Sequence, residues 1–213
     1  MKKTEIILKE GYPFIFVTGI IFIISILFRF DIIWQIGYFA LFAFMVYFFL
    51  NPERIPDESG NDVIISPADG EIIEIIETKE EFFTNTDMIK ISIRLGLLDN
   101  HIQRSPIEGI LKETKYVHGE FLALSSEKAS ELNEQNRTLF ENENMSVVTN
   151  QIAGFITRRI VNWHSEGNIS LASRYGMIMF GSQVDVYIPK ETTLKVIVGE
   201  KIKAGESLIG FVK

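Results

Sequence analysis

Hydrophobic residues crowd into the first fifty positions of the chain, in two long runs. Residues 12–28 are apolar except for Thr18, Gly19 and Ser25, residues 32–50 are nearly as apolar, and only three residues separate the runs. Each run has roughly the 17 to 20 residues that an α-helix needs to cross a bilayer. Phe, Ile and Leu would lie on every face of such helices, which argues against a helical pair buried in a soluble protein. We therefore predict a transmembrane helical hairpin over residues 1–50.

Basic residues near the two runs predict the orientation of this hairpin. Lys2, Lys3 and Lys9 precede the first run and Arg54 follows the second. By the positive-inside rule, both ends and the rest of the chain face the cytoplasm, although Arg29 in the turn opposes this assignment. A cleaved signal peptide is the alternative. It is less favoured, because no small-residue cleavage site follows the first run and a second apolar run comes at once.

The hydrophobic pattern changes to a period of two after a Pro- and Gly-containing linker at residues 51–60. In residues 88–95, isoleucines alternate with polar side chains, as in a half-buried strand. A short helix or irregular excursion is expected at 126–136. We predict a mainly β domain over 61–213, a mixed and mostly antiparallel sheet with barrel-sandwich-like elements. Further strands are expected at 63–65, 71–77, 110–117, 139–140, 145–149, 152–161, 177–180 and 184–188, with short strands and glycine turns at 193–212.

Composition and charge exclude several classes of function. The chain is 46% hydrophobic and carries a net charge of −7, whereas a nucleic-acid-binding protein needs a basic patch. It contains no cysteine, and its three histidines lack the spacing of a metal-binding pair. We therefore predict neither a nucleic-acid partner nor a metal site.

Two strand-like runs meet at Gly181-Ser182, the stretch with the clearest candidate chemistry. One interpretation is a bulge or tight hairpin, in which Gly adopts a positive φ and Ser bonds to the local backbone. In the other, Gly allows close approach to its carbonyl while Ser places a hydroxyl beside it, as an intramolecular attack on the peptide bond requires. Taken alone, the pattern favours the first interpretation and leaves the second open.

Three other polar features are candidates for function. Asp69 lies in the turn 66–70, where an aspartate commonly bonds its own backbone. His101 lies in a loop at 97–109 that is richer in polar groups than packing requires. The pair Arg158-Arg159 fits either a solvated face or a grip on an anionic headgroup.

The order of these features resembles that of a known family. From residue 51 to the C-terminus the chain is similar to the phosphatidylserine decarboxylases, in the short form shared by some bacteria and by archaea, whose ether-lipid counterpart is archaetidylserine. The resemblance rests on Pro-Ala-Asp-Gly at 67–70, Asp-x-His-x-x-Arg-Ser-Pro-x-x-Gly at 99–109, Asn-Glu-Gln-Asn at 133–136, Gln-Ile-Ala-Gly-Phe-Ile-Thr-Arg-Arg at 151–159 and Phe-Gly-Ser at 180–182.

The resemblance implies that the chain cuts itself between Gly181 and Ser182. In the family, the serine attacks the preceding carbonyl, the resulting ester is eliminated, and hydrolysis of the dehydroalanine leaves an N-terminal pyruvoyl group. Here this would give a large chain, 1–181, and a small chain, 182–213, that carries the cofactor derived from Ser182. The keto group then acts as the electron sink for loss of CO₂, so no pyridoxal phosphate is required.

The resemblance also implies roles for two other residues. Asp69 matches the acid that helps to activate the serine, and His101 matches a histidine associated with decarboxylation, which would orient the substrate carboxylate or return a proton to the α-carbon. Two positions depart from the family pattern. Arg104 replaces the second histidine of long members and cannot act as a base, and Gln135 replaces an arginine. Either Asp69 or His101 then takes the serine proton, or backbone strain drives cleavage.

The sequence therefore predicts a membrane-tethered, pyruvoyl-dependent decarboxylase on the cytoplasmic face. It would convert phosphatidylserine to phosphatidylethanolamine, or archaetidylserine to archaetidylethanolamine, with the bilayer and its lipid as partners and self-association left open. A membrane-anchored barrel-sandwich scaffold or adaptor is the alternative, but the exposed hairpin lysine or long helical arms of such a module are not visible. Arg104 also leaves open a family member that never cleaves.

Overall fold

A computed structural model describes residues 5–123, 128–155, 159–180 and 182–212. The chain folds into two compact units, Met1–Glu53 and Arg54–Lys213. Several positions discussed above lie outside the described residues, among them Lys2, Lys3, Arg158, Gly181 and the first two residues of the predicted excursion at 126–136.

The first unit is an antiparallel pair of helices. A short 3₁₀ turn, η1 (Lys9–Gly11), leads into α1 (Tyr12–Leu27), and α2 (Ile32–Phe48) follows. Gly19 lets the helices approach, because a Cβ at this position would lie 3.3 Å from the Phe42 ring. The rings of Phe22 and Phe39 lie 5.4 Å apart. The predicted helical hairpin is confirmed.

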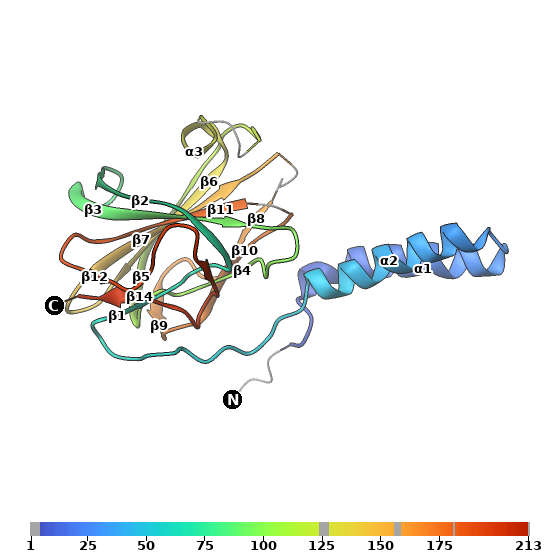
Figure 1. The fold of residues 1–213 in the computed structure, drawn as a ribbon, viewed down its shortest axis with the longest axis horizontal. Helices are drawn as coiled ribbons and strands as arrows, with labels where there is room; N and C mark the ends of the chain where they lie inside the picture. Colours follow the sequence, from blue (N-terminus) through green and yellow to red (C-terminus); the bar gives the residue numbers. More distant parts are fainter. Residues whose placement is uncertain (1–4, 124–127, 156–158, 181, 213) are drawn as a thin grey trace. The chain divides into compact units, whose positions relative to one another are not determined.

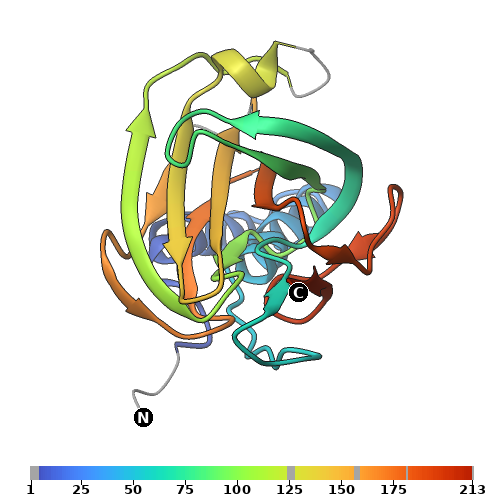
Figure 2. The ribbon, with the colours of Figure 1, turned by 90° about the vertical axis from the view of Figure 1, so that its left-hand side faces the viewer.

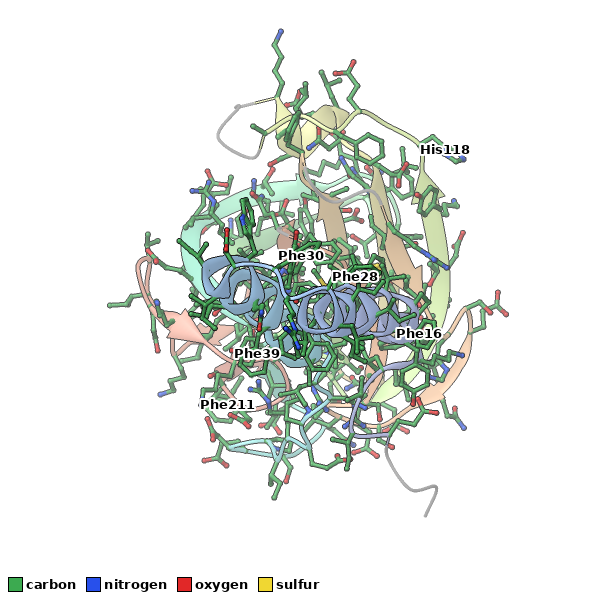
Figure 3. All side chains as sticks on the ribbon, turned by 90° about the vertical axis from the view of Figure 1, so that its right-hand side faces the viewer. Phe16, Phe28, Phe30, Phe39, His118 and Phe211 are labelled. Carbon is green, nitrogen blue, oxygen red and sulfur yellow. The ribbon has the colours of Figure 1, made fainter. Side chains whose placement is uncertain are left out.

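Apolar side chains also cover the outward faces of these helices. Phe16, Phe28 and Phe39 are 69%, 74% and 52% exposed and project from the pair (Figure 3). The helix over Lys9–Leu27 has 19 residues and is apolar and long enough to cross a membrane, whereas Ile32–Phe48 is a shorter apolar helix. This unit therefore has the surface and length of a membrane-associated segment.

The second unit is built from antiparallel strands and one short helix, α3 (Ala129–Leu132). All the paired strands among the described residues run antiparallel, which confirms the predicted mainly β class. The strands are β1 (Val63–Ile65), β2 (Gly70–Glu80), β3 (Thr86–Leu95), β4 (Ile102–Arg104), β5 (Gly109–Val117), β6 (Gln135–Glu141), β7 (Ser146–Ala153), β8 (Ile160–Asn162), β9 (Gly167–Ile169), β10 (Arg174–Ile178), β11 (Ser182–Pro189), β12 (Thr193–Leu194), β13 (Lys201–Ile202) and β14 (Leu208–Phe211).

These strands form three sheets (Figure 1). The largest has eight strands in the order β13-β2-β3-β11-β7-β6-β5-β9, and two three-stranded sheets have the orders β1-β14-β12 and β4-β10-β8. β2 pairs with β3 through a register shift between Ile72 and Glu74, and such bulges bend a strand. The strong curvature of β2 is visible in Figure 2.

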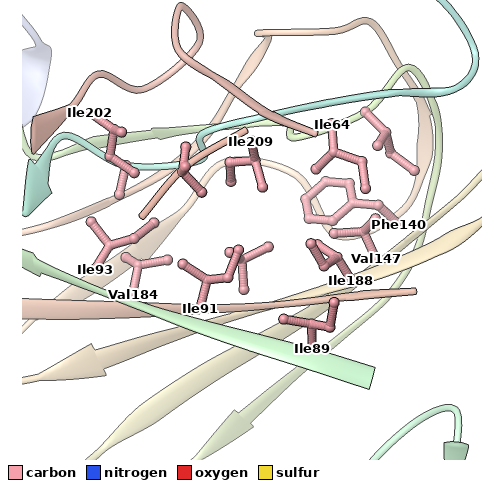
Figure 4. Packing of buried hydrophobic residues seen from close by; sticks show 14 of the residues in the cluster. Ile64, Ile89, Ile91, Ile93, Phe140, Val147, Val184, Ile188, Ile202 and Ile209 are labelled. Carbon is pink, nitrogen blue, oxygen red and sulfur yellow. The ribbon is translucent and has the colours of Figure 1, made fainter. Parts of the chain in front are cut away.

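The hydrophobic core lies between the eight-stranded sheet and the sheet that contains β1 and β14 (Figure 4). Ile91 and Ile93 from β3 and Val184 from β11 face Ile64 and Ile209, and all five side chains are fully buried. The alternation of apolar and polar residues along β3 and β11 places these side chains on one face of the sheet. The core thus fixes β11 in the middle of the large sheet.

Three sequence-based expectations about strands were wrong. The runs on either side of Gly181-Ser182 do not form a hairpin, because β10 and β11 belong to different sheets. Residues 152–161 are not one strand, because β7 ends at Ala153 and β8 begins at Ile160. The polar loop 97–109 contains the short strand β4. The periodicity of the sequence indicates which side chains face the core, but it fixes neither the ends of a strand nor the strands with which it pairs.

Candidate functional site

Ser182 is the first residue of β11 and lies between two neighbouring strands. Its register partners are Leu95 on β3 and Ala153 on β7. Its side chain shares the core face with Val184 and is completely buried. Among the described residues, the Ser182 Oγ has no hydrogen-bond partner. Because nearly all buried polar side chains in native proteins are bonded, this hydroxyl requires an explanation other than folding.

The backbone just before this serine is strained. Phe180 has a φ of 62°, in the left-handed region that bulky side chains rarely adopt. Such a conformation costs roughly 1 to 2 kcal/mol. It occurs where the chain leaves the β4-β10-β8 sheet and enters the eight-stranded sheet. Gly181, the other residue of the predicted cleavage site, lies outside the described residues.

Asp69 is oriented by the turn that precedes β2. The Ser66 Oγ donates a 2.7 Å hydrogen bond to the carbonyl oxygen of Ala68, which closes the turn. Gly70 then has a φ of 150°, and a Cβ there would lie 2.3 Å from the carbonyl oxygen of Arg94. Only glycine fits this position, where the chain enters β2 directly after Asp69.

Three donors converge on the Asp69 carboxylate, which is 8% exposed. Its Oδ1 accepts a 2.7 Å bond from the backbone N–H of Ala204. Its Oδ2 accepts from the Arg54 guanidinium at 3.0 Å and from the backbone N–H of Asn100 at 3.3 Å. Asp69 therefore joins the linker, the C-terminal segment and the loop that carries His101.

His101 is fully buried at the end of that loop. Its Nδ1 lies 2.8 Å from the carbonyl oxygen of Asp99. Because a carbonyl can only accept, Nδ1 carries the proton and the neutral ring has its lone pair on Nε2. Burial lowers the pKa of His101, and the carbonyl and charge of Asp99 and the charge of Asp69 partly offset this. His101 is therefore a neutral imidazole with the tautomer of a general base.

The fold brings the three predicted residues to one end of β3. Leu95, the partner of Ser182, is the last residue of β3, and the loop that follows leads within six residues to His101. The carbonyl oxygen of His101 accepts a 3.2 Å bond from the N–H of Ile178, four residues before Ser182. Asp69 is linked to this loop through Asn100. Ser182 and the loop that carries His101 and bonds to Asp69 thus meet at the same end of β3.

The two positions that depart from the family pattern are both buried. Arg104 donates from Nη1 to the carbonyl oxygen of Ala172 at 3.1 Å. The Gln135 Oε1 accepts from Arg137 Nη2 at 3.0 Å and from Asn150 Nδ2 at 2.9 Å. Gln135, which stands where the family has an arginine, therefore accepts a hydrogen bond from the guanidinium of Arg137 and supplies no guanidinium itself.

A chain of buried amides next to Ser182 was not predicted. Asn136 Nδ2 donates to Gln151 Oε1 at 2.7 Å, and Gln151 Nε2 donates to Gln103 Oε1 at 2.9 Å. Gln151 is the cross-strand partner of Val184, on the face that also carries Ser182. Gln103 lies in β4, in a different sheet from Gln151 and 48 positions away from it, so no local spacing in the sequence indicates this contact.

The opposite face of β11 lines a separate cleft of about 960 Å³. Gln183, Asp185 and Tyr187 point into it, together with Arg94 and Arg137 from neighbouring strands. Gln183 Nε2 donates to Asp185 Oδ1 at 2.8 Å. Burial raises the pKa of Asp185, which the hydrogen bond from Gln183 only partly offsets. This cleft is polar, but it does not contain the Ser182 hydroxyl.

A buried serine hydroxyl without a partner among the described residues, which directly follows a strained stretch of backbone, defines a candidate self-processing site. Comparison with known proteins agrees with this class. A family model described as Phosphatidylserine decarboxylase matches residues 41–210, and the chain belongs to that family.

Similar proteins include three that are each named phosphatidylserine decarboxylase proenzyme. That of Syntrophus aciditrophicus is 40% identical over 214 residues, covering 99% of both chains. That of Ehrlichia chaffeensis is 38% identical over 210 residues, covering 96% of this chain and 91% of the other. That of Carboxydothermus hydrogenoformans is 37% identical over 217 residues, covering 100% of both chains.

Proposed function

We propose that this protein decarboxylates phosphatidylserine to phosphatidylethanolamine through a pyruvoyl group formed from Ser182 by self-cleavage at Gly181. Family membership and the word proenzyme in the names of its relatives support this proposal. The observation that carries it is the Ser182 Oγ, which is buried without a hydrogen-bond partner among the described residues. Buried hydroxyls are usually bonded, and this one lies at the Gly-Ser pair of the family motif, so the position fits the precursor of a pyruvoyl group.

In the proposed maturation, the Ser182 Oγ attacks the carbonyl carbon of Gly181. The C–N bond breaks as the C–O bond forms, which leaves an ester and a free amine. Loss of the Ser182 α-proton then expels Gly181 as a carboxylate, and addition of one water with loss of ammonia leaves the keto group. The strain at Phe180 is relieved when the chain is cut, which favours the reaction.

His101 and Asp69 have complementary parts in this proposal. His101 accepts the serine proton at Nε2, because its Nδ1 proton is committed to Asp99. Asp69 holds the loop that carries His101 through Asn100, and its charge raises the pKa of His101. It therefore stabilises the imidazolium that forms when the proton is transferred. Arg104 has no proton-transfer role.

The pyruvoyl group supplies an electron sink for loss of CO₂ from the substrate. The protein's own task is to hold the substrate carboxylate in a dry site and to return one proton to the α-carbon, for which His101 is the proposed donor. Burial lowers the pKa of His101, so its protonated form is a strong acid that gives up this proton readily.

The helical hairpin explains how the enzyme would meet a lipid substrate. We propose that residues 1–50 anchor the protein in the membrane, that 51–60 link them to the catalytic domain at 61–213, and that this domain faces the cytoplasm. Confinement to the bilayer raises the effective concentration of the lipid at the site. The names of the relatives favour the diacyl lipid over archaetidylserine as substrate.

The intact mass of the purified protein beside its Ser182→Ala variant tests the proposal. We expect a small chain of residues 182–213, blocked at its N-terminus by a keto group, in the wild type and not in the variant. Vesicles of phosphatidylserine or of archaetidylserine then identify the lipid that loses CO₂. One full-length mass in both proteins would overturn the proposal and leave the scaffold alternative.

A further inference from the structure

Arg54 has contacts that the proposed reaction does not yet use. It is the first residue of the second unit and lies within the linker. Its Nη2 lies 3.0 Å from Asp69 Oδ2, and its Nη1 lies 3.4 Å from Glu206 Oε2. The side chains of Arg54 and Asp69 are each only 11% exposed. This ion pair is therefore largely shielded from water, unlike a surface pair.

The contacts of Asp69 come from three separate segments. Ala204 belongs to a turn in which the N–H groups of Glu206 and Ser207 bond to the carbonyl oxygen of Lys203. Gly205 in this turn has a φ of 74°, so the turn needs glycine there. The closed turn leaves the N–H of Ala204 directed at Asp69 Oδ1. The backbone of Asn100 provides the second contact and Arg54 the third.

Of these three donors, Arg54 alone carries a charge. The N–H groups of Ala204 and Asn100 are neutral, so the guanidinium is the group that compensates the Asp69 carboxylate. A carboxylate this shielded is costly without a cation partner. Without the charge of Arg54, the Asp69 carboxylate would gain by turning toward water. This would weaken its contact with Asn100, one residue before His101.

We propose that Arg54 is a positioning residue for self-cleavage, which holds the Asp69 carboxylate against Asn100 and thereby keeps His101 in place beside Ser182. The inference rests on the proposed function, because the part of Asp69 in cleavage belongs to that proposal. Arg54 acts through Asp69 and touches none of the reacting atoms. The linker thus contributes a side chain to maturation in addition to joining the two units.

The test is a time course of self-cleavage after cell-free synthesis of the full chain into lipid nanodiscs, followed by intact mass. We expect Arg54→Met to form the small chain about 10 to 100 times more slowly than the wild type, as for loss of a buried hydrogen bond to a charged group. Arg54→Lys keeps the charge and should be intermediate. Added guanidinium should accelerate Arg54→Met and leave the wild type unchanged. Lys112→Met, which breaks an exposed ion pair with Glu141, is the matched control and should cleave normally.

Several outcomes would overturn this inference. One is cleavage of Arg54→Met at the wild-type rate. Another is equal slowing of Arg54→Met and Arg54→Lys, with a lowered Tm and no response to guanidinium, which would make the contact purely structural. A third is slowing of self-cleavage by Glu206→Gln that is as great as by Arg54→Met. The effect of Arg54 would then depend on its contact with Glu206 and not on its contact with Asp69. Failure of the wild type itself to cleave would instead overturn the proposed function.

Discussion

The two faces of β11 differ in chemistry although they belong to one strand. The even-numbered residues from 182 to 188 are fully buried, and apart from Ser182 they are aliphatic. The odd-numbered residues from 183 to 187 are an amide, an acid and a phenol that line the polar cleft. Because side chains alternate across a strand, a one-residue shift in register would exchange the faces. The alternation thus decides that the Ser182 hydroxyl lies on the buried side of the strand.

Polar groups on the two faces are satisfied differently. On the core face, Gln151 bonds to Asn136 and Gln103. On the cleft face, Gln183 and Asp185 bond to each other beside a space large enough for water. The buried face therefore depends on hydrogen bonds within the protein, whereas the cleft face can also bond to water. Three substitutions test this difference, from the largest expected effect to the smallest.

Ile188→Ala on the buried face should have the largest effect. Ile188 is fully buried in the core cluster, and truncation of such a side chain removes apolar contacts and leaves a cavity. We expect the free energy of unfolding to fall by about 2 to 5 kcal/mol, measured by denaturant unfolding in detergent. Ile197→Ala, at a position that is 72% exposed, should change it by less than about 0.5 kcal/mol. Equal losses would contradict the assignment of the core face.

Gln151→Leu should have an intermediate effect. The substitution keeps the side chain's approximate size but leaves Asn136 Nδ2 and Gln103 Oε1 without their bonds. We expect a loss of about 1 to 3 kcal/mol, the cost of unsatisfied buried groups, in the same unfolding assay. Asn168→Leu, at an exposed position, is the control. A neutral or stabilising Gln151→Leu would show that the buried face does not depend on this amide chain.

Asp185→Asn on the cleft face should have the smallest effect on stability, and it should stabilise the protein where the other two substitutions destabilise it. Burial raises the pKa of Asp185 above its ordinary value, so the folded state binds a proton more tightly than the unfolded state does. Stability is therefore lost as pH rises from the unfolded pKa through the folded one. The amide avoids this loss, and we expect the Tm at pH 7 to rise by at most a few degrees.

The pH dependence of this gain provides the control for Asp185→Asn. Near pH 4 the wild-type acid is protonated in much of the folded population, so the difference in Tm should shrink. A gain of the same size at both pH values would indicate a packing effect, and a loss at pH 7 would contradict the cost of burying this charge.

Much of this architecture could be predicted from local patterns. The two apolar runs predicted the helical hairpin, and alternation predicted β3 and most of β11. Pairing could not be predicted in the same way, because β10 and β11 are adjacent in sequence yet join different sheets. A period of two shows which residues face the core, but the partner of a strand depends on contacts distant along the chain.

The same limit applies to the candidate site. Ser182, His101 and Asp69 lie in short motifs that can be recognised in the sequence. Arg54 contributed only to the predicted orientation of the helical hairpin, as a basic residue after the second apolar run. Its partner Asp69 is 15 positions away, and the amide chain links Gln103 to Gln151 across 48 positions. Nothing local to either sequence segment shows such contacts, which exist because separate sheets pack together.

The burial of Ser182 also limits what kind of chain end can exist there. Chain termini normally lie at the protein surface, and ordinary hydrolysis before residue 182 would leave an α-ammonium group between β3 and β7, where the serine is completely buried. An unpaired cation in such a place is strongly unfavourable. A terminus that ends in a ketone is neutral. The interior of the sheet would thus tolerate the proposed cut only if the nitrogen is lost, which links the position of the serine to the chemical form of the chain end that this cleavage would create.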